Sequence, residues 1–186
     1  AGWIVALSFA GREAPKAEKQ ESPKGEIPAA VTAERHSPLD TLDWLVGDWV
    51  NEDQNRSIEF NCHFTKNGSF LVRSFRMVTE KDVRMSGMQL IAWDPANQLI
   101  RSWTFDSDGG FGEDSWTQNG NSYTIRAKYT LPDGGKASAV NVFTFVNADT
   151  CTWKSVNREI DGELQPDVDE ITLVRKNDQS TSPGGK

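Results

Sequence analysis

The side chains that could bind a small molecule lie among aromatic residues in segments with an alternating apolar pattern. Because every second residue of a strand shares a face, five polar groups are predicted to share one interior: Arg73, Gln89, Arg101, Asn141 and Ser155. The apolar side chains on the same faces are Phe75, Ile91, Trp103, Phe105, Phe143 and Trp153. An apolar interior with a few polar groups is typical of a small-molecule pocket. A buried arginine is costly without a partner, so we expect Arg101 or Arg73 to pair with an anionic group of the ligand.

Residues suited to covalent or acid–base catalysis are sparse. His36 falls in a charged, proline-rich segment, and alternation places His63 on the outward face of its strand, which leaves no Ser–His–Asp arrangement. A carboxylate beside one of the interior arginines could still move a proton, and Glu113 is the carboxylate that the pattern directs inward. The sequence therefore favours binding without catalysis, and an interior lyase or isomerase is the alternative. A shift of one residue in register would turn any of these faces outward.

The densest acidic cluster runs from Asp106 to Asp114 and contains three glycines. It does not fit an EF-hand calcium loop, because Phe111 stands where the loop requires glycine and Thr117 where it requires glutamate. A glycine-rich turn with a bulge is the predicted structure, and a cation site or a lid at a barrel mouth is the alternative. We expect no cofactor and no metal ion.

Cys62 and Cys151 each lie in an apolar, strand-like segment. Buried free thiols are the expected state, and a disulfide is the alternative. With two cysteines and two histidines in the chain, the composition offers little material for metal or thiol chemistry.

Strands are predicted for almost all of residues 39–176. Turn sequences such as Asn67-Gly68 and Asn119-Gly120 separate short runs rich in Val, Ile, Thr, Phe and Trp. One helical turn with Leu42 and Leu45 inward is expected before the first strand. The strands are expected near 47–52, 56–65, 69–79, 83–93, 98–106, 111–118, 121–131, 136–147, 150–159 and 168–176.

Ten successive strands with tight connections predict an all-β fold, an antiparallel up-and-down β-barrel with one short helix before its first strand. Closure protects the strand edges from pairing with other chains. A barrel of ten strands is wider than its own side chains can fill, so we expect a cavity inside it.

Charge and hydropathy exclude two classes of partner. The chain has 186 residues and a net charge of −7, which disfavours binding to the phosphate backbone of nucleic acids. It contains no apolar run near 18 residues, so no membrane span is predicted. A small molecule in the barrel is the partner that the predicted interior favours.

The segment Gly47-Asp48-Trp49 resembles the Gly-x-Trp signature of lipocalins and the wider calycin group, whose fold also resembles that of fatty-acid-binding proteins. In that family the Trp closes one end of the barrel, and an Arg near the end of the last strand lies across its ring. Arg175 has that position in the last predicted strand. The resemblance implies a structural cation–π pair between Trp49 and Arg175.

The stretch from about 42 to 176 also resembles lipocalin-like domains of uncharacterised bacterial proteins, notably from planctomycetes. The similar pieces are LDWLVGDWV, IAWDP, IRSWTFDSDGGFGEDSW, LPDGGKASA and TWKSVNREIDGELQP. In those proteins the domain follows a SnoaL-like domain, so the resemblance implies such a domain as an upstream partner. A role that only supports that domain is the third functional alternative.

The chain is predicted to have four parts. Residues 1–10 form an apolar strand that resembles the end of a SnoaL-like domain, and a signal-peptide remnant is the alternative. Residues 11–38 combine balanced charges with four prolines and are predicted to be a disordered linker with few contacts to the barrel. Residues 39–176 form the barrel, and residues 177–186 form a disordered polar tail.

Overall fold

The computed structural model describes residues 37–52, 56–79 and 82–176. Residues 1–36 and 177–186 lie outside that range, so the predictions for the apolar segment, for the linker up to residue 36 and for the tail stay predictions. Ser37 and Pro38, which the linker prediction included, instead cap and begin a helix. The described residues form the 3-10 helix η1 (Pro38–Leu45) and the strands β1 (Gly47–Glu52), β2 (Arg56–Phe64), β3 (Phe70–Thr79), β4 (Asp82–Asp94), β5 (Leu99–Asp106), β6 (Phe111–Asn119), β7 (Ser122–Thr130), β8 (Lys136–Asn147), β9 (Thr150–Ile160), β10 (Glu163–Gln165) and β11 (Val168–Arg175).

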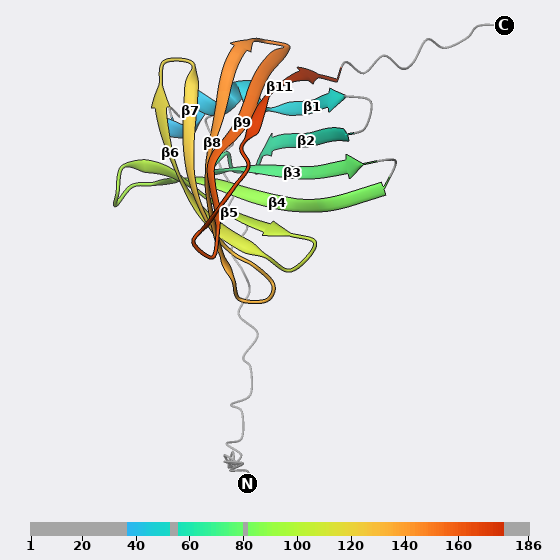
Figure 1. The fold of residues 1–186 in the computed structure, drawn as a ribbon. Helices are drawn as coiled ribbons and strands as arrows, with labels where there is room; N and C mark the ends of the chain where they lie inside the picture. The colour runs from blue at the N-terminus through green and yellow to red at the C-terminus, as the bar shows by residue number, and fades with distance from the viewer. Residues whose placement is uncertain (1–36, 53–55, 80–81, 177–186) are drawn as a thin grey trace, which may run out of the picture. The chain divides into compact units, whose positions relative to one another are not determined.

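Ten of these strands close into an antiparallel barrel (Figure 1). Each strand from β1 to β9 pairs with the next along the chain, and β11 completes the ring by pairing with both β9 and β1. The predicted all-β, up-and-down barrel with a short preceding helix is confirmed.

The short strand β10 was not among the predicted strands. It forms a hairpin with the far end of β9, and Asp161 and Gly162 between them have positive φ angles of 49° and 86°. Such angles suit the tight turn that an Asp-Gly pair favours. Pro166 then interrupts the pairing because it has no N–H to donate, and the chain continues along β9 as β11. β10 and β11 are thus two segments that lie along one neighbour.

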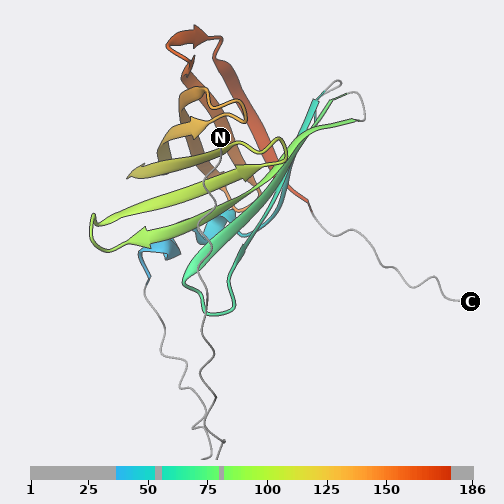
Figure 2. The same ribbon diagram turned by 90° about the horizontal axis from the view of Figure 1, so that it is seen from below.

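The helix η1 closes one end of the barrel, where strands surround it (Figure 2). A capping box starts the helix, since the Ser37 side chain accepts from a backbone N–H of the first turn and Asp40 accepts from the Ser37 N–H. Leu39, Leu42 and Leu45 are fully buried and join the core of the barrel, so the predicted inward face is confirmed. This end of the interior is therefore filled.

Trp49 and Arg175 hold the same end together. The Trp49 ring is fully buried, and the guanidinium carbon of Arg175 lies 4.4 Å from its centroid, as the sequence predicted. Gly47 has a φ of +117°, and a Cβ atom at that position would collide with the Arg175 guanidinium. Glycine before this Trp therefore makes room for the arginine that covers it.

Candidate functional site

A cavity of about 220 Å³ lies inside the barrel, away from the helix-filled end. Its walls are mostly apolar, with one polar side chain from each of the six strands β3 to β8. The residues that border it are Ile58, Phe60, Arg73, Phe75, Met77, Met85, Gln89, Thr104, Asp114, Ile125, Ala127, Tyr129, Asn141, Phe143, Trp153 and Leu173. The interior space expected from the number of strands is present.

Arg73 is the cationic group of this cavity. Its guanidinium lies among three aromatic rings, with its central carbon 5.5 Å from the centroid of Phe60, 5.6 Å from that of Phe75 and 5.3 Å from that of Phe143. Its Nε atom is buried without a hydrogen-bond partner, and within the described part of the chain no carboxylate forms an ion pair with it. Burial lowers the pKa of Arg73, but the guanidinium stays protonated at neutral pH. The cavity thus holds a guanidinium with unused donors, and the Asp114 carboxylate on the same wall acts on its charge without forming an ion pair.

Gln89, Ser102 and Asp114 form a buried hydrogen-bond network beside Arg73. The Ser102 hydroxyl donates to Asp114 Oδ2 at 2.6 Å, and the Gln89 amide nitrogen donates to Ser102 Oγ at 3.0 Å and to Asp114 Oδ2 at 2.9 Å. Trp116 Nε1 also donates to Ser102 Oγ, at 2.8 Å. The Gln89 amide oxygen is buried and has no partner. Gln89 and Arg73 are direct cross-strand partners and both border the cavity.

The face that we predicted for β5 is wrong. Ser102 and Thr104 point inward, whereas Arg101, Trp103 and Phe105 lie outside the barrel. Arg101 bonds to Glu113 at 2.7 Å, lies 3.6 Å from Asp94 and stacks on Trp103, so it has partners and does not serve the cavity.

The predicted inward face of β6 is also displaced by one residue. Glu113 pairs with Arg101 on the outside, and Asp114 is the carboxylate that borders the cavity. The physical reason is the Ser102–Asp114–Trp116 network, which puts small polar groups inward and leaves large aromatic rings on the outer wall.

The other predicted site residues lie in the interior, but not all of them border the cavity. Arg73, Phe75, Gln89, Asn141, Phe143 and Trp153 do. Ile91 packs in the filled end, and Ser155 is buried opposite Asn141 without bordering the space. The ligand-binding role of these residues stays a prediction.

Asp114, Thr104 and Tyr129 are the cavity residues with polar groups that the sequence analysis did not predict. A signal for Asp114 was present, since Gly112, Asp114 and Trp116 alternate and a core position for Trp116 would have placed all three inward. The aromatic Trp103 and Phe105 of the neighbouring strand gave the competing pattern and led to the opposite register.

The acidic, glycine-rich segment is a turn that supports Tyr129. Asp106 accepts from the Tyr129 hydroxyl at 2.6 Å and from the backbone N–H of Gly110 at 2.8 Å. A Cβ atom on Gly110 or Gly112 would collide with the Tyr129 ring. Burial and the bond to Asp106 raise the pKa of Tyr129, which therefore stays protonated at neutral pH. Contacts with Tyr129 thus account for Gly110, Gly112 and Asp106 of this segment.

Both cysteines are buried and free. Burial raises the pKa of each thiol to about 12, although the nearby charge of Arg73 opposes the shift at Cys62 and those of Arg175 and Arg73 oppose it at Cys151. A thiol with such a pKa is not a nucleophile at neutral pH. His63 is exposed on the outer wall, as predicted, with Nδ1 3.2 Å from Asn61 Oδ1.

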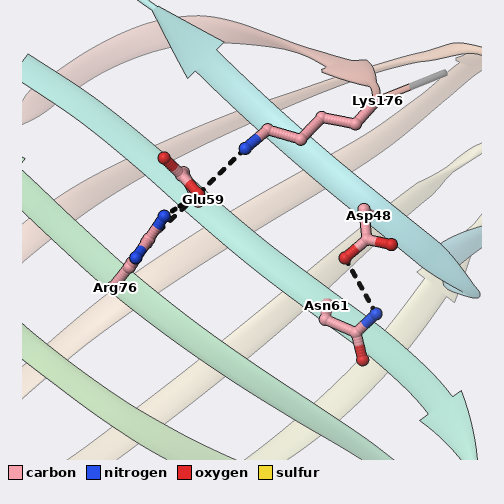
Figure 3. Close-up of polar contacts among 5 residues, drawn as sticks. All are labelled: Asp48, Glu59, Asn61, Arg76 and Lys176. Carbon is pink, nitrogen blue, oxygen red and sulfur yellow. Dashed lines mark hydrogen bonds and ion pairs between the residues drawn. The ribbon is translucent and has the colours of Figure 1, made fainter. Parts of the chain in front are cut away.

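A larger hollow, of about 560 Å³, lies on the outer face of β1–β5. Figure 3 shows its charged groups: Glu59 accepts from Arg76 at 2.8 Å and from Lys176 at 3.0 Å, and Asp48 accepts from Asn61 at 2.9 Å. Both cations are thus paired with Glu59, and Asp48 accepts from an amide. The interior cavity is the better candidate site, because its charge and its amide oxygen have no partner.

The chain matches no protein-family model and no curated protein. Its fold is compatible with a lipocalin-like barrel. In the described part of the chain, no helix is long and apolar enough to cross a membrane. The same residues contain no cluster of three His, Cys, Asp or Glu side chains that could hold a metal ion.

Proposed function

We propose that this barrel binds a small, partly apolar organic anion in its interior, with Arg73 as the counter-charge. The observation that carries the proposal is the Arg73 guanidinium, which lies among aromatic rings on the cavity wall and whose buried Nε has no hydrogen-bond acceptor. A buried cation without an anion is costly, and a bound carboxylate would remove that cost while forming charge-assisted hydrogen bonds. The aromatic walls suit the apolar part of such a ligand.

The size of the cavity limits the ligand. A volume of about 220 Å³ accommodates on the order of ten non-hydrogen atoms. Aromatic monocarboxylates such as 3-phenylpropionate fit this limit, whereas long-chain fatty acids exceed it.

Binding of 3-phenylpropionate against its neutral alcohol, 3-phenylpropanol, tests the proposal by calorimetry. We expect the acid to bind more tightly, and Arg73→Met to weaken the acid about 10- to 100-fold while changing the alcohol little. Arg101→Met is the matched control, because Arg101 lies outside and pairs with Glu113. Equal binding of acid and alcohol, or an undiminished acid affinity in Arg73→Met, would contradict the proposal.

An enzyme that moves a proton in the same cavity is a second candidate. The observation in its favour is Asp114, a buried carboxylate that borders the cavity with Arg73. A carbon acid held by Arg73 could exchange a proton with Asp114, as a lyase or isomerase requires. Deuterium exchange at C3 of phenylpyruvate, followed by NMR, tests this: protein-dependent exchange that Asp114→Asn abolishes supports it, and exchange at the buffer rate excludes it for this substrate.

A supporting role for another domain is a third candidate. Met88, Phe105 and Phe111 are neighbours on three adjacent strands and are 46 %, 51 % and 51 % exposed on the outer wall. An exposed apolar row is a feature of contact surfaces. The calycin assignment and the upstream SnoaL-like domain also remain proposals; the pair of Trp49 and Arg175 supports the first. Exchange broadening of Met88 and Phe105 NMR signals on adding a SnoaL-like domain would favour this role.

A further inference from the structure

We infer that the ligand carries a hydrogen-bond donor beside its acid group, and that the amide oxygen of Gln89 recognises this donor; the inference rests on the proposed binding of an anion at Arg73. The ligand class is thus a small aromatic or alicyclic acid with a hydroxyl or amide N–H one or two bonds from its carboxylate. Its carboxylate would face Arg73 and its donor would face Gln89.

The orientation of the Gln89 amide follows from its neighbours. The one hydroxyl proton of Ser102 goes to Asp114, and its oxygen already accepts from Trp116. Ser102 therefore has no proton left for Gln89, and the Asp114 carboxylate has none either. Gln89 has to donate both amide hydrogens to this pair, as it does, at 3.0 Å and 2.9 Å.

This orientation leaves the amide oxygen of Gln89 as an acceptor without a partner. The residue is 3 % exposed, it borders the cavity, and its oxygen accepts no hydrogen bond from any described residue. Turning the amide would bring that oxygen against the Asp114 carboxylate, so the network opposes the flip. A buried acceptor held in this way is satisfied when a donor enters the cavity.

The side chains of Gln89 and Arg73 leave adjacent strands at the same point of the cavity wall. The two residues are directly opposed in the β3–β4 ladder and both point inward, which places their Cβ atoms about 5 Å apart. A ligand that fills both positions needs an acceptor and a donor separated by a few bonds. A 2-hydroxy acid meets this need, because its carboxylate and its hydroxyl are on adjacent atoms.

Three acids of nearly equal shape test the inference on the unmodified protein. Mandelate has the hydroxyl, α-fluorophenylacetate replaces it with an atom that cannot donate, and phenylacetate lacks it. By calorimetry we expect the better enantiomer of mandelate to bind about tenfold more tightly than either analogue. Equal affinities of the three acids would overturn the inference and leave the proposed anion binding in place; binding of none would overturn both.

A variant pair locates the effect. Gln89→Met keeps the side-chain length and removes the acceptor, together with the two donors to Ser102 and Asp114. We expect it to abolish the preference for mandelate, measured as the ratio of the mandelate and phenylacetate affinities of the same variant. Gln118→Met is the control, since Gln118 is exposed on β6, and it should keep the preference. A folded Gln89→Met protein that still prefers mandelate would contradict the inference. If that variant does not fold, the comparison of the three acids on the unmodified protein decides.

Discussion

The guanidinium of Arg175 covers the buried ring of Trp49, with 4.4 Å between its central carbon and the ring centroid. The two residues are direct partners in the β1–β11 ladder, which closes the barrel. Arg175 also donates to the backbone oxygens of Trp44 at 3.1 Å and Ala148 at 2.9 Å. One side chain thus links the first strand, the last strand, the helix end and the β8–β9 turn.

Replacing Arg175 with methionine should destabilise the barrel. The variant loses the cation–π contact and leaves carbonyl groups at the helix end without a donor, so we expect the free energy of unfolding to fall by about 1–3 kcal/mol. Urea denaturation measures the change. The matched control is Arg126→Met on the exposed face of β7, for which we expect a change below about 0.5 kcal/mol. Equal effects of the two variants would show that the contact with Trp49 contributes little.

Arg73→Met should have the opposite effect on the free protein. The guanidinium has no anionic partner in contact, so an apolar side chain of similar length relieves its desolvation. We expect the free energy of unfolding to stay unchanged or to rise by up to about 2 kcal/mol, although the contacts with three phenylalanines offset part of the gain. Thermal unfolding with and without 3-phenylpropionate measures this. A marked loss of stability without ligand would mean that Arg73 is structural.

The ion pairs of Glu59 predict a pH-dependent contribution to stability. Burial alone would raise the pKa of Glu59, but hydrogen bonds from Arg76 and Lys176 hold it below its ordinary value. A carboxylate with a lowered pKa in the native state stabilises it above the unfolded pKa, near 4.3, and loses this effect as the pH falls through the native pKa. Glu59→Gln should therefore cost about 0.5–1 kcal/mol near pH 7 and almost nothing near pH 2.

Urea is the denaturant for this measurement. Guanidinium chloride is a salt and would screen the ion pairs of Glu59. Glu163→Gln is the control, since Glu163 is exposed on β10. A Glu59 effect that is the same at both pH values would contradict the assignment of the lowered pKa to these ion pairs.

The two thiols should resist alkylation in the folded protein. Cys62 and Cys151 are 1 % and 0 % exposed, and their pKa values are raised to about 12. Because the thiolate is the reactive form, we expect iodoacetamide at about pH 8 to label neither residue until denaturant is added, and then both. Mass spectrometry counts the labels. Rapid labelling of the native protein would mean that the end of the barrel closed by η1 opens readily.

Local chemistry determined the strands and their order. Alternating apolar residues and turn pairs such as Asn67-Gly68 act over a few residues, so they can be read without knowing what lies across the sheet. The helix before β1 and the alternation that puts Arg175 on one face of the last strand follow from the same short patterns. The family resemblance added the expectation that Arg175 meets Trp49.

The tertiary structure decided which face of β5 and β6 points inward. Both faces of β5 combine polar and apolar residues, so its alternation fits either register. The buried bonds of Ser102 to Asp114 and Trp116 favour one of them, and they form only when the strands are paired. The charged groups that border the cavity are therefore Arg73 and Asp114, and not Arg101 and Glu113. The sequence did not predict this, because hydrogen bonds between distant residues cannot be read from the spacing within one strand.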